Sequence, residues 1–145
     1  MLPRIKNRLP LSYRWIRANG LGRLIPWHFR DDPERVQLLR HEYRLEMDGT
    51  SDILPFAERQ DREDIAGFIV VDGVIQDRVL EMHLTWAGAR DMYWLKPGEQ
   101  PPPLDLDKYP SFQDWLVQVM LADSLEWQSE EDLTAILSGD WPTFG

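Results

Sequence analysis

Cysteine is absent from this chain of 145 residues, which removes several kinds of chemistry at once. Without cysteine there are no disulfides, no thiolate ligands for a metal and no thiol nucleophile. A chain without disulfides also suits a reducing compartment, so we expect a cytoplasmic protein. Apolar runs of about 18 residues are missing too, so we expect no membrane-spanning helix. The short apolar stretch 9–11 ends at Ser12 and Arg14, which is not the pattern of a signal peptide.

Acidic side chains are missing from the first 30 residues, although the chain as a whole carries a net charge of −9. This opening stretch has a charge of +7, so residues 31–145 together carry −16. Its basic residues are Arg4, Lys6, Arg8, Arg14, Arg17, Arg23 and Arg30. They could bind nucleic acid or neutralise the acidic remainder of the chain, and we favour the second interpretation. The acidic remainder of the chain disfavours nucleic acid as a partner, because it repels phosphates, whereas a basic protein suits it.

Local patterns predict helices at both ends of the chain and strands in the middle. Asp32 and Pro33 are typical of a helix start, and that helix is expected to end near Arg44. Ser111 is expected to cap a helix whose apolar residues recur at helical spacing. The remaining expected helices cover residues 12–19, capped by Ser12, and residues from Ser129 to Gly139. The expected strands cover residues 54–57, 65–71 and 78–86.

The pair Asp72-Gly73 predicts a two-residue hairpin turn that leads into Val74 and Ile75. The strand that follows is expected to continue this hairpin through a bulge near Gln76. Adjacent strands joined in this way are antiparallel. We therefore predict one α+β domain over residues 1–145, with a central, mostly antiparallel sheet flanked by helices.

The loop between the first two strands holds a cluster of carboxylates. Asp61, Glu63 and Asp64 lie close together in sequence, and Arg59 and Arg62 lie among them. Carboxylate oxygens are ligands for Mg²⁺ and Ca²⁺, so a metal-dependent enzyme is one hypothesis. Neutralisation by the two arginines is the simpler interpretation, and it leaves the loop available to contact a partner. We therefore predict no metal, no cofactor and no catalytic residue, and take these three acids as candidate partner contacts.

Tryptophan is frequent, with seven residues. The helical spacing places Trp115 in the core, and Trp15 and Trp127 are expected to pack as well. Trp27, Trp86, Trp94 and Trp141 lie near turns or termini, where exposure is expected. Tyr93 and Trp94 are the aromatic candidates for a protein interface, because tryptophan buries a large area at low entropic cost.

Several motifs, taken in order along the chain, resemble the SUKH superfamily of Smi/Knr-like domains. The matching residues are Leu9-Pro10, Tyr13 and Asn19-Gly20, then Leu54-Pro55-Phe56-Ala57, then Asp61, Asp64-Ile65-Ala66 and Phe68, and finally Tyr109, Ser111-Phe112 and Trp115-Leu116. The resemblance implies an α+β fold and no catalysis. It also implies a binding function, since many bacterial members look like immunity proteins that neutralise a partner toxin.

We therefore expect a non-enzymatic protein-binding domain, of the immunity-protein type, that masks a toxin such as a nuclease. Three alternatives remain. They are a regulatory or scaffold protein without a toxin partner, a divalent-metal enzyme using Asp61, Glu63 and Asp64, and a nucleic-acid binder using the basic first 30 residues.

Overall fold

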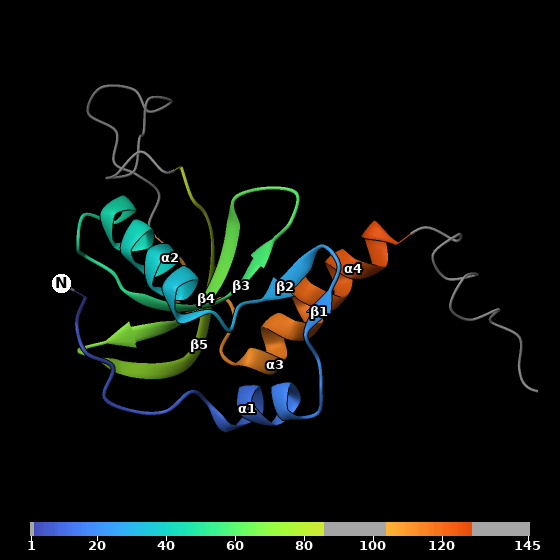
Figure 1. The fold of residues 1–145 in the computed structure, drawn as a ribbon, viewed down its shortest axis with the longest axis horizontal. Helices are drawn as coiled ribbons and strands as arrows, with labels where there is room; N and C mark the ends of the chain where they lie inside the picture. Colours follow the sequence, from blue (N-terminus) through green and yellow to red (C-terminus); the bar gives the residue numbers. More distant parts are fainter. Residues whose placement is uncertain (1, 86–103, 129–145) are drawn as a thin grey trace, which may run out of the picture.

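The computed structural model describes residues 2–85 and 104–128, and Figure 1 shows a sheet with helices on both faces. The sheet has five strands in the order β1-β2-β3-β4-β5, and each pairs antiparallel with the next. The prediction of an α+β fold with an antiparallel sheet is thus confirmed. The elements are α1 (Leu11–Ala18), β1 (Arg23–Leu24), β2 (Trp27–Phe29), α2 (Pro33–Glu46), β3 (Ile53–Arg59), β4 (Asp64–Val71), β5 (Val74–His83), α3 (Phe112–Trp115), the π-helical segment η1 (Leu116–Leu121) and α4 (Ala122–Trp127).

The β4–β5 hairpin forms where the sequence predicts it. Asp72 and Gly73 both have positive φ values, 51° and 80°, as a two-residue turn of this kind requires. The register shifts between the pairs Phe68↔Val79 and Val70↔Ile75, so β5 holds more residues than β4 in this interval. The expected bulge near Gln76 is therefore present, and β5 runs on past it to His83.

Successive side chains along each strand point to opposite faces of the sheet, so the core forms two layers. The layer under α2 includes Leu39 and Tyr43 from the helix and Leu80 and Met82 from β5. The layer on the opposite face is aromatic and lies under α1 and the α3–α4 segment (Figure 1). Its fully or nearly fully buried rings are those of Tyr13, Trp27, Phe29, Phe56, Phe68, Phe112 and Trp115.

Helix α2 begins as predicted. The Asp32 side chain accepts a hydrogen bond from the Glu34 backbone N–H at 3.0 Å, and Pro33 occupies the first turn. The helix continues two residues beyond the expected end at Arg44, to Glu46. In the middle of the helix, Arg40 donates to both oxygens of Asp52 at 2.9 and 2.6 Å and forms a buried ion pair.

The long C-terminal helix also begins as predicted, with Ser111 accepting from the Asp114 backbone N–H. Phe112, Trp115, Val119 and Met120 are buried, which confirms the apolar stripe. The sequence does not predict the change to π-helical hydrogen bonding from Leu116 to Leu121. The helix predicted from Ser129 lies outside the described residues.

Helix α1 starts one residue before the prediction, at Leu11. Pro10 stands at the cap position, and Ser12 is not the cap. Tyr13 faces the core as expected, whereas Trp15 lies on the other side of the helix and is 67% exposed. Trp15 therefore does not pack, and Trp127, at 44% exposure, packs only in part.

Trp27 is fully buried, so the expectation that it is exposed is wrong. The short strand β2 turns its side chain into the aromatic layer, where it meets Trp115 edge-on with ring centroids 5.1 Å apart. Trp86, Trp94 and Trp141 lie outside the described residues. Among the helices that the structure does describe, none is long and apolar enough to cross a membrane.

Candidate functional site

The β3–β4 loop, residues 60–63, is held at its first end by Arg59. This guanidinium donates to both oxygens of Asp61 at 2.9 and 3.0 Å, and to Asp123 of α4 at 3.1 Å. The Trp27 indole N–H donates to the same Asp123 oxygen at 2.8 Å. The arginine thus links the loop to the helical layer, and its hydrogen bond holds the pKa of Asp61 below the usual range.

Backbone hydrogen bonds fix the remainder of the loop. The Gln60 N–H donates to the Pro26 carbonyl at 2.9 Å, and the Leu84 N–H donates to the Glu63 carbonyl at 2.8 Å. The loop is therefore attached to the β1–β2 turn on one side and to the end of β5 on the other. An ordered loop loses little conformational entropy when a partner binds.

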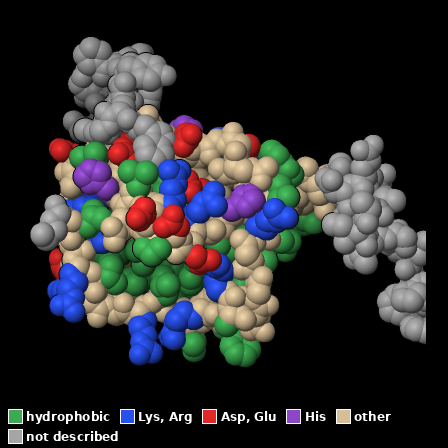
Figure 2. Space-filling model, viewed as in Figure 1, with side chains coloured by type: hydrophobic (Ala, Val, Ile, Leu, Met, Phe, Trp, Pro, Cys, Tyr) green, Lys and Arg blue, Asp and Glu red, His purple; other side chains and the backbone are tan. Residues whose placement is uncertain are grey.

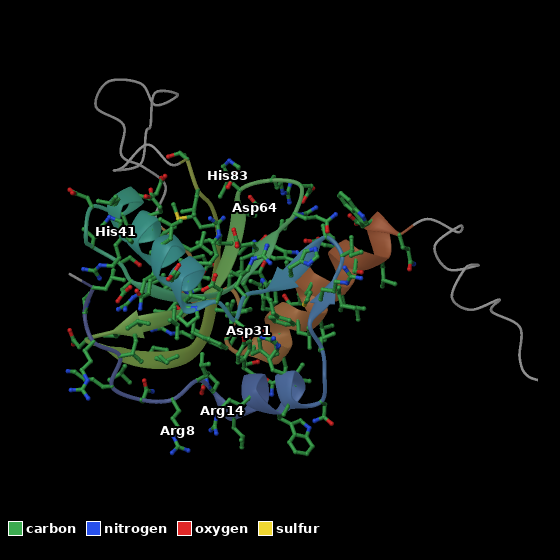
Figure 3. All side chains as sticks on the ribbon, in the orientation of Figure 1. Arg8, Arg14, Asp31, His41, Asp64 and His83 are labelled. Carbon is green, nitrogen blue, oxygen red and sulfur yellow. The ribbon has the colours of Figure 1, made fainter. Side chains whose placement is uncertain are left out.

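Asp64 begins β4 and is buried, with an exposed fraction of 8%. Arg62 pairs with one of its carboxylate oxygens at 2.6 Å, and His83 of β5 pairs with the other through Nδ1 at 2.8 Å. Asp64 and His83 are directly opposed in the β4–β5 register. Figure 3 shows them side by side at one end of the sheet.

Glu81 lies on the same face of β5 as His83, two residues earlier, and is opposed to Ala66. Burial, together with the nearby carboxylates Asp64 and Asp123, raises the pKa of Glu81 to about 7. The end of the sheet therefore holds five carboxylates, those of Asp61, Glu63, Asp64, Glu81 and Asp123. Sequence reasoning missed Glu81 and Asp123, because only the strand register and the helix packing bring them here.

The three predicted carboxylates do not converge on a common point. Asp61 faces Arg59, Asp64 faces Arg62 and His83, and Glu63 is exposed within the electrostatic reach of Arg35. Within the described ranges, no group of three or more His, Asp or Glu side chains is placed to hold a metal ion. What this arrangement offers is an ordered, charged surface.

Two of the predicted basic residues pair with acids of the same chain. Arg17 pairs with Asp31 at 2.6 Å, and Arg30 pairs with the buried Glu58 at 2.5 Å. These pairs agree with the interpretation that the basic segment neutralises part of the acidic chain. The aromatic candidates Tyr93 and Trp94 lie outside the described residues.

Comparisons with protein-family models, with curated proteins and with solved structures found no match to this chain.

Proposed function

We propose that the chain is a non-enzymatic protein-binding domain that masks a basic partner, as an immunity protein masks its toxin. The proposal keeps the function that the resemblance to the SUKH superfamily implies, and a cytoplasmic location with it. The observation that carries it is the order of the β3–β4 loop. Asp61 and Glu63 are exposed on this loop, and Arg59 and backbone hydrogen bonds hold the loop in place.

Charge supports a basic partner. Five acidic side chains gather at this end of the sheet, although Glu81, with a pKa of about 7, carries only part of a charge at neutral pH. Arg59 and Arg62 pair with Asp61, Asp123 and Asp64, and Arg35 lies within electrostatic reach of Glu63, so the acids still outnumber the arginines. The excess of negative charge would steer a basic surface toward the loop and speed the encounter. A nuclease that binds nucleic acid through basic side chains has a surface of this kind.

Order in the loop supports tight binding. Asp61 is held by two hydrogen bonds from one guanidinium, so its direction is set before any partner arrives. A partner that binds here does not have to order the loop, so more of the contact energy appears as affinity. The same guanidinium occupies the oxygens that a divalent cation would need, so the geometry favours binding over metal-dependent catalysis.

The test is capture of partners from the native host with the tagged full chain, in buffers of low and moderate salt. A single stoichiometric, basic protein is expected, and its retention should fall as salt rises. The captured partner, expressed alone in a heterologous host, should stop growth. Co-expression of the chain with this partner should restore growth.

A charge-reversal pair identifies the surface. Glu63→Lys should lower the association rate about tenfold at low salt, because a positive charge then faces a basic partner. Asp77→Lys makes the same change at an exposed position on β5 and should leave the rate near that of the unaltered chain. Equal rates for the two variants would remove the loop from the interface, and a captured partner that is harmless when expressed alone would point to a scaffold or regulatory protein.

A further inference from the structure

A second surface, whose lining includes none of the loop residues, lies in a cleft of about 580 Å³ between α1, the start of α2 and strand β3. We call it the α1–α2 cleft. Its floor is Leu54, Pro55 and Phe56, and Tyr13 and Val36 form apolar parts of its walls. Figure 2 shows hydrophobic side chains gathered in a hollow near the centre of this face, with Lys and Arg side chains along its lower rim.

The cleft exists because β2 is shorter than β3. Strand β2 pairs only with Ala57–Arg59 of β3, and the chain then leaves the sheet toward α2. Residues 53–55 of β3 therefore have no strand beside them on this side. Pro55 lies in this open stretch and has no N–H to offer, which discourages the addition of another strand. A ligand here must be held by its side chains rather than by a ladder of backbone hydrogen bonds.

Arginines give the cleft a positive rim on a negatively charged protein. Arg14, Arg17 and Arg30 line it, with Asp31 as the acidic lining residue. Arg17 is used within the chain, because it pairs with Asp31 at 2.6 Å and donates to the Tyr13 hydroxyl at 2.8 Å. This ion pair joins the α1 wall to the segment that precedes α2.

The other two arginines keep donors available. Arg14 is oriented by its Nε, which donates to the Leu9 carbonyl at 2.9 Å, and Arg30 by its Nε, which donates to Glu58 at 2.5 Å. No described residue accepts from the Nη atoms of either side chain. The two guanidiniums thus combine a fixed position with free N–H groups suited to carboxylate oxygens.

We propose that the α1–α2 cleft binds an acidic segment of a protein partner, with a bulky apolar side chain placed between two carboxylates. The apolar side chain covers Leu54 and Phe56, and the carboxylates reach Arg14 on α1 and Arg30 before α2. Because these arginines belong to different walls, a polypeptide with acids on both sides of its apolar residue satisfies both. An amphiphile with one charged group would satisfy only one.

This site is distinct from the β3–β4 loop. Figure 3 places Arg14 and Asp31 in the lower half of the molecule and Asp64 and His83 at its upper end. The two surfaces also have opposite charge. The two surfaces are thus suited to partners of opposite charge.

The experiment selects binders from a displayed library of random peptides, using the full chain as bait. We expect enrichment of peptides in which Asp or Glu flanks Trp, Phe or Leu. The strongest peptide is then synthesised with a fluorescent label, and its affinity is measured by anisotropy. Arg14→Glu should weaken it by about tenfold or more, because repulsion replaces an ion pair.

Two further variants make the result decisive. Arg23→Glu carries the same charge change on the exposed residue Arg23 of β1, outside the cleft, and should bind like the unaltered chain. Val36→Asp places a charge on the apolar wall and should abolish binding of the peptide. An unchanged melting temperature of this variant would show that the chain is still folded. Enrichment without acidic residues, or equal affinity for the Arg14→Glu and Arg23→Glu variants, would overturn the proposal.

Discussion

At the scale of single residues, neighbouring charges shift the pKa values of two largely buried glutamates in opposite directions. Burial alone would raise the pKa of Glu58, but hydrogen bonds from Arg35 and Arg30 outweigh it and hold the pKa below its usual value. Glu81 receives no such bonds from the described residues and lies beside Asp64, so its pKa rises to about 7. The difference comes from the arginines that reach one carboxylate and not the other.

Glu81 should therefore make stability fall as pH rises. In the unfolded chain this carboxyl loses its proton near pH 4.5, whereas in the folded chain it keeps the proton until about pH 7. Folding thus favours the protonated form, and the penalty grows from about pH 4.5 and is complete above pH 7. Glu81→Gln should raise the free energy of unfolding by about 1–2 kcal/mol at pH 8, less than the full shift implies because the side chain is partly exposed, and change it little at pH 4.5.

Urea denaturation at the two pH values measures this difference. The substitution Glu126→Gln, at an exposed position on α4, is the matched control and should change the free energy of unfolding little at either pH. A constant effect of Glu81→Gln at both pH values would mean that Glu81 is ionised in the folded chain throughout the range.

At the scale of elements, α2 is held on the sheet by a buried ion pair as well as by its apolar face. Arg40 and Asp52 are 5% and 9% exposed, and Arg44 adds a longer contact to Asp52 at 3.4 Å. The Asp52 carbonyl also accepts from the Val70 N–H, so the residue joins helix, β3 and β4. Such a pair fixes the position of the helix more than it adds to net stability.

Removal of one partner of this pair should lower the free energy of unfolding far more than removal of both. Arg40→Met leaves the buried Asp52 carboxylate with the weaker contact from Arg44 at 3.4 Å, and should lower the free energy of unfolding by about 3 kcal/mol. The double variant Arg40→Met with Asp52→Leu should return to within about 1 kcal/mol of the unaltered chain, since both charges of the pair are then replaced by apolar side chains. Urea denaturation of the three variants tests this. A double variant as unstable as Arg40→Met would show that the pair adds stability that apolar packing does not replace.

At the scale of the whole molecule, the N-terminal segment and residue 109 cover the outer edge of β5. Asn7 makes two hydrogen bonds with the Ile75 backbone, accepting from its N–H at 2.7 Å and donating to its carbonyl at 3.0 Å. The Lys6 N–H donates to the Gly73 carbonyl at 2.8 Å, and the Val79 N–H donates to the Tyr109 carbonyl at 2.9 Å. These contacts occupy backbone groups that would otherwise be open to another chain.

Asn7→Ala should release the N-terminal segment from this edge. Loss of the two hydrogen bonds should lower the free energy of unfolding by about 1–2 kcal/mol and speed hydrogen exchange at the Ile75 amide. Arg8→Ala, at the exposed neighbouring position, should change neither quantity. Unchanged exchange at Ile75 in the Asn7→Ala variant would show that other contacts protect this edge.

Residues that act through near neighbours could be interpreted from the sequence alone. Asp32 caps α2 and Ser111 caps the C-terminal helix through backbone groups two or three residues away. Asp72-Gly73 closes the β4–β5 hairpin within the turn itself, and alternation along β5 assigns Val79 and Leu80 to opposite faces. These features, and the α+β class that follows from them, depend on local geometry.

Contacts between distant parts of the chain decided the candidate sites. The sequence determined that Asp61, Glu63 and Asp64 share one loop, but strand register and helix packing brought Glu81 and Asp123 to it. Trp27 is buried because α3 lies over its strand, and the α1–α2 cleft is open because β2 stops short of the full length of β3. Local preference cannot encode such features, since burial and charge depend on which surfaces meet when the chain folds.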